Sequence, residues 1–300
     1  MTYTTRYITP PQEDEEIYPY RRVWPSLGLE NGIFFAVTAA IFFAVNFLSF
    51  SLPDAFVRPL NFALALLPLG LWLLFSYRAE YRVPQPRERL LSVLIISALA
   101  ANAIGIPLLN DFFQVERWVP LGDNSERILG YTFTVGAVQE IIKYLVIRYL
   151  TWPRLFRTRA DSIAYGAASA IGYGTVENLH FVFSGAALPD YAAIYIFDTI
   201  AVNLAASIIV AYGLSETRFG NPSPFLLPFM VFLASLTTGI VVALRAGLIN
   251  ASFTLQGAFA RPLLGFLFSV GVLLAASVIF IFLFENSERR AREAAAAQGD

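Results

Sequence analysis

The sequence predicts an all-α polytopic membrane protein, built as a bundle of about eight transmembrane helices. Of its 300 residues 57% are hydrophobic and only 14% are charged, and the mean hydropathy is +0.59. A soluble domain has about 25% charged residues, so this composition departs strongly from that class. The apolar residues also form long uninterrupted blocks, which is typical of membrane spans.

Eight of these blocks are long enough to cross a bilayer as helices. They fall at about residues 33–50, 59–77, 90–109, 128–150, 162–183, 191–214, 225–244 and 263–284. We therefore divide the chain into a polar arm at 1–32, a membrane domain at 33–284 and a charged, alanine-rich tail at 285–300. Because the arm has no apolar core, we expect no cleavable signal peptide, and the first span would insert the chain.

The distribution of arginine predicts the orientation of the bundle. Lys143 lies within a span, and five of the 21 basic residues fall in the loops on one side: Arg58, Arg117, Arg127, Arg245 and Arg261. The other fifteen fall in the segments on the side of the two termini. Cytoplasmic loops carry the excess of arginine and lysine. We therefore expect a multi-pass protein of the plasma (inner) membrane with both termini cytoplasmic.

Composition also excludes several functions. The chain has no cysteine, which rules out disulfides, thiolate metal sites and cysteine nucleophiles. A net charge of −1 with scattered arginines argues against nucleic-acid binding, which needs a dense basic face. The expected partners are membrane lipids and a transmembrane protein, as substrate or as binding partner. We find no internal repeat of the kind that marks many transporters.

The stretch Gln139-Glu140-Ile141-Ile142-Lys143 places two charges near the middle of the fourth span. A charge at the centre of a membrane helix costs about 2.5–3.5 kcal/mol on insertion scales. Residues three and four apart share a helix face, so Glu140 and Lys143 should stack, with Gln139 beside them. Lys143 is the only lysine of the chain.

The next two spans carry polar groups that can meet this stretch. In the fifth span Gly166, Ala170 and Gly174 form a small-residue stripe that continues to Glu177, and Asn178 and His180 follow. In the sixth span Thr199, Asn203 and Ser207 form a polar stripe, with Asp198 beside it. Small residues let helices approach closely in lipid, so the stripe should bring Glu177 to a neighbouring helix. We expect these groups to converge on one cavity that opens outward.

Structural and functional interpretations compete for each of these residues. A buried ion pair can simply fix the packing of two helices, and we favour that role for Lys143 and Asp198. Ionisable groups inside membranes usually mark function, and we favour that role for Glu140 and Glu177. A metal is a further alternative, because Glu177-x-x-His180 together with Glu140 supplies three ligands, the number found in catalytic zinc sites. The sequence offers no second histidine to such a site.

Taken together, these motifs resemble the PrsW family of intramembrane proteases, which is related to the CAAX-processing and bacteriocin-processing membrane peptidases. The resemblance rests on Gln139-Glu140-x-x-Lys143 and on the glycine-rich run from Tyr165-Gly166 to Gly174 that ends in Val176-Glu177-Asn178. It covers residues 128–214 best. It implies cleavage of peptide bonds in or near the membrane, with glutamates and histidines activating a water, in some accounts through a metal. By position, Glu140, Lys143, Glu177 and Asn178 match residues of the family pattern.

The chain departs from that pattern at three places. Gln139 stands where the family has a first glutamate, Asn203 stands where a later histidine is expected, and residues 234–238 hold no final histidine. Amides hold hydrogen bonds but do not act as general bases at neutral pH. These departures favour reduced or lost catalysis.

Three hypotheses follow. In a rearranged peptidase, Glu140 and Glu177 would position the water, His180 would act as acid/base or ligand, and Asn178 would stabilise the oxyanion. In a non-catalytic descendant, the same fold would serve as a membrane scaffold or as a subunit of a larger complex. A small transporter or proton conductor is the third and least supported hypothesis. A hydrated cavity around the carboxylates would favour the enzyme, and a fully paired cluster would favour the scaffold.

Overall fold

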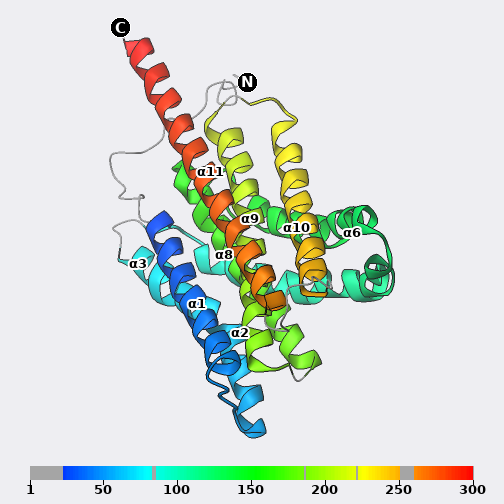
Figure 1. Cartoon of the computed structure of the whole chain (residues 1–300). Helices are drawn as coiled ribbons and strands as arrows, with labels where there is room; N and C mark the ends of the chain where they lie inside the picture. Colours follow the sequence, from blue (N-terminus) through cyan, green and yellow to red (C-terminus); the bar gives the residue numbers. More distant parts are fainter. Residues whose placement is uncertain (1–22, 83–85, 186, 221, 251–259, 300) are drawn as a thin grey trace.

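The computed structural model describes all residues except 1–22, 83–85, 186, 221, 251–259 and 300. Every regular element among the described residues is a helix, which confirms the predicted all-α class (Figure 1). In chain order these elements are α1 (Val23–Asn46), α2 (Asp54–Trp72), η2 (Leu73–Tyr77), α3 (Arg78–Tyr81), α4 (Leu90–Ala100), η3 (Ala101–Gly105), η4 (Leu108–Phe112), α5 (Val115–Trp118), η5 (Val119–Leu121), α6 (Asn124–Tyr131), η6 (Thr132–Gly136), α7 (Ala137–Leu150), α8 (Arg159–Ser184), α9 (Pro189–Phe219), α10 (Leu226–Asn250) and α11 (Ala260–Gly299).

Six helical segments are long and apolar enough to cross a membrane, so the protein is a polytopic membrane protein. Within the described residues these are Val23–Asn46, Asp54–Tyr81, Leu90–Leu121, Pro189–Phe219, Leu226–Leu244 and Leu264–Arg290. The other two predicted spans, 128–150 and 162–183, are also helical but are not among the six. Both carry the polar and glycine residues discussed above, which lower their hydropathy. The count of eight and the orientation of the termini stay predictions.

Helix α1 is described from Val23, ten residues before the predicted start of the first span at Ile33. Tertiary contacts account for this extension of the helix into a polar stretch. The ring of Trp24 lies 6.3 Å from that of Phe284 on α11, and Glu30 accepts a 2.5 Å hydrogen bond from the hydroxyl of Ser76. The apolar pattern alone did not indicate these partners.

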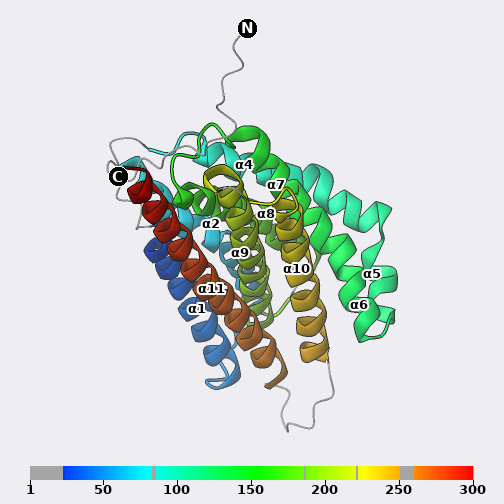
Figure 2. The same ribbon diagram turned by 90° about the horizontal axis from the view of Figure 1, so that it is seen from above.

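Helix α9 is the centre of the bundle. It packs against α8, α10, α11, α1 and α2, and Figure 2 shows it surrounded by these helices. Nearly all of its side chains are buried, since much of its sequence is alanine and other small residues. A membrane helix that is buried on all sides is free to carry polar groups on any face, because none of its faces meets lipid.

Small residues on α8 set the distance to α9, as the sequence predicts. A Cβ atom on Gly166 would lie 3.2 Å from the carbonyl oxygen of Ser207, and one on Gly174 would lie 2.8 Å from the side chain of Ile200. Both neighbours belong to α9. The predicted stripe therefore does bring α8 and α9 into close contact, and it fixes the height at which Glu177 meets α9.

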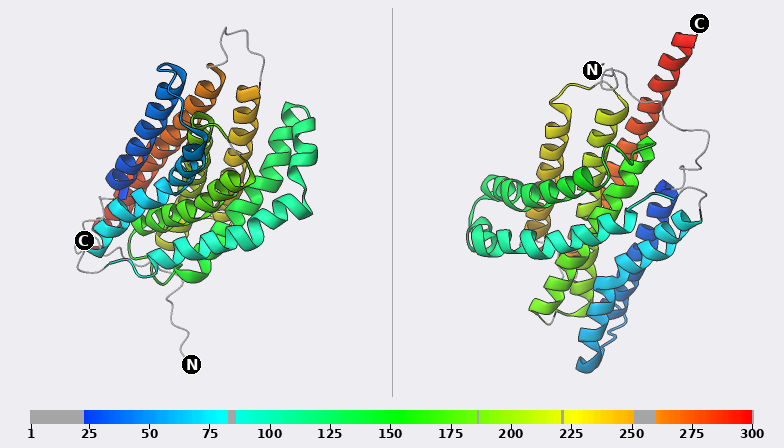
Figure 3. Two further views of the ribbon diagram at one scale, coloured as in Figure 1. Left: turned by 90° about the horizontal axis from the view of Figure 1, so that it is seen from below. Right: turned by 180° about the vertical axis from the view of Figure 1, so that it is seen from behind.

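The segment from η4 to α6 forms a helical hairpin that projects from the bundle beside α10 (Figure 3). Asp123 caps α6 by accepting a 2.8 Å hydrogen bond from the backbone N–H of Glu126. The predictions treat most of this region as a loop, because its acidic residues interrupt the apolar run. The hairpin returns the chain to the bundle, where η6 and α7 continue inward.

Candidate functional site

Three polar residues of α7 point into the bundle, and two of its apolar residues lie on its outer face. Gln139, Glu140 and Lys143 are buried, whereas Ile141 and Leu145 are 46% and 40% exposed. This arrangement suits a helix that meets lipid on its outer face, since lipid solvates aliphatic side chains and not charges. The inner face of α7 contacts α8 and α9.

Five residues from three helices form one hydrogen-bonded network, which we call the polar cluster: Gln139, Glu140 and Lys143 of α7, Glu177 of α8, and Asn203 of α9. The Lys143 Nζ lies 2.7 Å from the Glu140 Oε1, so the predicted pairing of these two residues is present. The same ammonium donates to the Oδ1 of Asn203 at 2.9 Å and to its backbone carbonyl at 3.3 Å.

Glu177 completes the cluster from α8. Its Oε2 accepts a 2.9 Å hydrogen bond from the Nδ2 of Asn203, and its Oε1 accepts one from the Nε2 of Gln139. The second proton of the Asn203 amide goes to the carbonyl of Thr199 at 3.0 Å. Each oxygen of this carboxylate thus receives an amide donor, and both donors stand at positions where the resemblance places a glutamate or a histidine.

Tyr173 lies beside the cluster and was not singled out from the sequence. Its ring centroid is 6.0 Å from the Lys143 Nζ, and its side chain is fully buried. A Cβ atom on Gly105 of η3 would lie 2.2 Å from the tyrosine hydroxyl, so only glycine fits there. Tyr173 precedes Glu177 by four residues, and this helical spacing was the available signal.

Several buried polar atoms on the helices that carry the cluster have no hydrogen-bond partner among the described residues. They are the Oε2 of Glu140, both amide atoms of Asn178 and the hydroxyl of Tyr173. Asn178 is fully buried on α8. A buried polar group left without a partner costs about 1–3 kcal/mol, so these atoms are places where a water or a peptide group can bond. Polar groups of this kind are what a substrate-binding site would offer.

The structure does not bring His180 into the polar cluster. Its side chain is exposed near the end of α8, and its Nε2 lies 3.4 Å from the Nδ2 of Asn110, in η4. Asp198 is fully buried on α9. The structure therefore brings Gln139, Glu140, Lys143, Glu177 and Asn203 together in one network, whereas His180, which was expected at the same point, lies apart from it.

The residues present do not fit a metal ion. Among the described residues no group of three or more histidine, cysteine, aspartate or glutamate side chains is placed to hold one. Catalytic zinc takes three protein ligands of this kind. Here Glu140 is paired with an ammonium and Glu177 is held by two amides, while the histidine lies apart. The predicted set of Glu140, Glu177 and His180 is therefore not assembled.

Comparison with known proteins gives one family. Residues 85–210 match the family model described as PrsW family intramembrane metalloprotease. Searches among curated proteins and among solved structures each gave no match. The matched segment runs from the turn before α4 into α9 and contains all five residues of the polar cluster. The predicted resemblance to the PrsW family is confirmed over this segment, which carries the polar cluster.

Proposed function

We propose that this chain is a PrsW-type membrane protein that has lost peptidase activity and acts by binding a transmembrane partner. The observation that carries the proposal is the bonding of Glu177. Its two oxygens accept hydrogen bonds from Gln139 and Asn203, two amides that cannot take up a proton at neutral pH. A carboxylate held in this way is a poor acceptor for the proton of an attacking water.

The second carboxylate is no better placed. Glu140 is fully buried and is neutralised by Lys143 at 2.7 Å, so its charge already has a partner. Losing a general base typically lowers a rate by about 10²–10⁴-fold. With one carboxylate held by amides and the other by an ammonium, the cluster is better suited to fixing α7, α8 and α9 than to activating water.

A specific observation favours a second candidate, a rearranged peptidase. The Oε2 of Glu140 and the amide of Asn178 are buried without hydrogen-bond partners among the described residues. A carboxylate oxygen and an amide donor are the two kinds of group that hydrolysis of a peptide bond requires. This candidate keeps Glu140 as base and Asn178 as oxyanion donor.

Cleavage of a transmembrane reporter by the full chain in native membranes separates the two functions. We expect wild type, Glu140→Gln and Asn178→Ala to give the background level of membranes that lack the protein. Glu116→Gln changes an exposed carboxylate of the hairpin in the same way and is the matched control. Cleavage by wild type and by Glu116→Gln that falls at least 100-fold in Glu140→Gln would establish the peptidase instead.

A further inference from the structure

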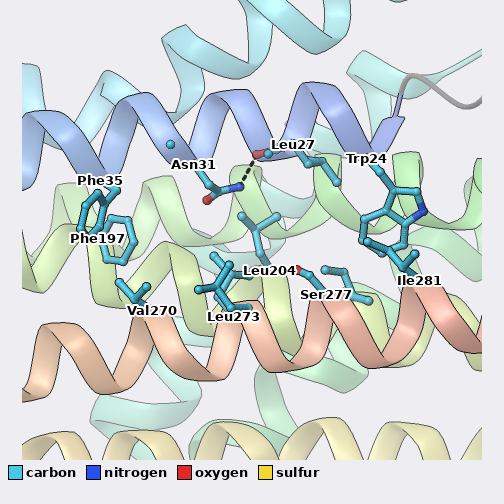
Figure 4. A pocket seen from close by; sticks show the side chains of 14 residues that line it. Trp24, Leu27, Asn31, Phe35, Phe197, Leu204, Val270, Leu273, Ser277 and Ile281 are labelled. Carbon is cyan, nitrogen blue, oxygen red and sulfur yellow. Dashed lines mark hydrogen bonds between the residues drawn. The ribbon is translucent and has the colours of Figure 1, made fainter.

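A long apolar cavity lies between α1 and α11, over the face of α9 that carries no part of the polar cluster (Figure 4). Its volume is about 450 Å³, or about 1090 Å³ with its open side included. The walls are aliphatic and aromatic apart from Asn31 of α1 and Ser277 of α11. Asn31 already donates a 2.7 Å hydrogen bond to the carbonyl of Leu27 in its own helix, so the lining has little polar character to offer.

Two glycines leave the α1 wall of this cavity open. A Cβ atom on Gly28 or on Gly32 would have no heavy atom within 4 Å. The Gly-x-x-x-Gly spacing is one at which membrane helices often pack together, yet no described helix fills this face. The space in front of the two glycines is therefore not filled by any described residue.

Aromatic contacts between α1 and α11 close the cavity at both ends. Phe35 stacks on Phe266 with ring centroids 5.1 Å apart, and Trp24 meets Phe284 at 6.3 Å. The cavity is thus a slot of fixed length that opens sideways. An occupant has to fit between these two contacts.

The dimensions select a hydrocarbon chain over a helix. The lining runs eleven residues along α1, from Trp24 to Phe35, which is about 16 Å at 1.5 Å per residue. That length equals about half of the 30 Å hydrocarbon core, the reach of one leaflet. Dividing the enclosed volume of about 450 Å³ by this length gives a cross-section of about 28 Å², whereas a helix 10–12 Å across needs roughly 80 Å² or more. An extended chain whose neighbours lie at van der Waals distance needs only roughly 20 Å².

Basic residues lie beyond the Trp24–Phe284 end of the slot. Arg289 and Arg290 are exposed on α11, eight and nine residues past Ile281, the last lining residue of that helix. Each donates one of its five N–H groups to its own helix, Arg289 to Asn286 at 2.9 Å and Arg290 to Ser287 at 3.0 Å. The remaining donors have no hydrogen-bond partner among the described residues and can bind a phosphate. Arg21 and Arg22 also precede α1 in the sequence.

We propose that the slot binds one acyl chain of an anionic phospholipid, whose headgroup lies at Arg289 and Arg290. In the predicted orientation this lipid belongs to the cytoplasmic leaflet. Each basic residue near a membrane surface favours an anionic lipid by about fivefold. Glu285 and Glu288 of α11 oppose this, so the preference should be moderate. The site does not depend on whether the polar cluster is catalytic.

The full chain is reconstituted into vesicles of equal parts phosphatidylglycerol and phosphatidylethanolamine and then extracted into detergent. Native mass spectrometry of the extracted protein measures which phospholipid it retains and so tests the proposal. We expect wild type to retain one phospholipid, enriched at least fivefold in phosphatidylglycerol. Gly28→Leu/Gly32→Leu fills the slot and should lower the retained fraction at least tenfold. Gly70→Leu makes the same change at another open helix position on α2 and should retain lipid as wild type does. Arg289→Gln/Arg290→Gln should keep the lipid but lose most of the enrichment.

Ser277→Phe fills the slot from α11. This second variant keeps the test valid if Gly28→Leu/Gly32→Leu does not fold. Helix content by circular dichroism identifies the variants that fold. The proposal is overturned when folded Gly28→Leu/Gly32→Leu and Ser277→Phe retain as much phospholipid as wild type. It is equally overturned when wild type holds no lipid but forms a dimer that the filled variants lose, because the occupant is then a second copy of this chain.

Discussion

Replacing Lys143 with methionine removes the only cation of the polar cluster and keeps a side chain of similar length. Lys143 is 2% exposed, and Glu140, its partner at 2.7 Å, is fully buried and has no other hydrogen-bond partner among the described residues. The variant therefore leaves an uncompensated carboxylate inside the bundle. Breaking a buried pair in this way lowers the free energy of unfolding by about 3–5 kcal/mol.

Glu140→Gln, which changes the partner of Lys143, should lower the free energy of unfolding less than Lys143→Met does. In Glu140→Gln the ammonium of Lys143 keeps two acceptors, the Oδ1 and the carbonyl of Asn203, so we expect a loss of about 2 kcal/mol. The double variant Glu140→Gln/Lys143→Met holds neither charge and should be more stable than Lys143→Met alone. We expect a coupling free energy of at least about 2 kcal/mol between the two positions.

Reversible unfolding in mixed micelles, driven by a denaturing detergent and followed by tryptophan fluorescence, measures these differences. Glu116→Gln is the control, because this exposed carboxylate lies in the projecting hairpin and its change should alter stability by less than about 0.5 kcal/mol. A cost below about 1 kcal/mol for Lys143→Met, or costs that simply add in the double variant, would refute the buried pair and the network built on it.

Four further outcomes are expected. Asn203→Leu removes the two hydrogen bonds by which the Asn203 side chain ties α9 to the cluster and should lower the free energy of unfolding by about 3 kcal/mol. Gly136→Ala should lower the free energy of unfolding by about 1–3 kcal/mol in the same assay, because the added Cβ would lie 2.3 Å from the carbonyl oxygen of Ser235. Gly70→Ala is the control and should leave the free energy of unfolding unchanged, because no heavy atom lies within 4 Å of the added Cβ. A reporter domain that is active only in the cytoplasm should be active when it is fused to either terminus, because the arginine distribution predicts that both termini are cytoplasmic. Gln139→Glu should make thermal stability depend on pH and on added zinc.

The parts of the fold and site that the sequence predicted are those set by local patterns. Long apolar blocks identify helices because the hydrocarbon core demands them, and the spacing of Glu140 and Lys143 identifies their pair because it is a property of one helix. The small-residue stripe on α8 predicted a close neighbour, and α9 is that neighbour. These inferences need no knowledge of distant contacts.

The remaining features depend on where helices begin, end and tilt. His180 shares the helix of Glu177, but it lies close to the end of α8 at Ser184, where the chain leaves the bundle, so its side chain is exposed. The spacing of Tyr173 and Glu177 puts the two residues on one face of α8, but the place of the tyrosine hydroxyl also depends on how closely η3 approaches α8 at Gly105. The sequence did not predict the helical hairpin from η4 to α6, because acidic residues interrupt the apolar run in this segment.

Gln139 donates an amide hydrogen bond to Glu177 where the resemblance places a carboxylate, and Gln139→Glu tests whether this amide takes the place of a cation. Gln139 donates directly to Glu177, so a glutamate at position 139 would place two carboxylates next to each other. The cluster would then hold three carboxylates and one ammonium, Lys143, which is already paired with Glu140. Repulsion between adjacent carboxylates is relieved by a shared proton or by a divalent cation. We therefore expect the melting temperature of Gln139→Glu to fall below that of wild type at pH 8 and to recover at pH 5 or with zinc, while wild type responds to neither. A variant that melts as wild type does under all three conditions would mean that the amide at position 139 does not take the place of a cation.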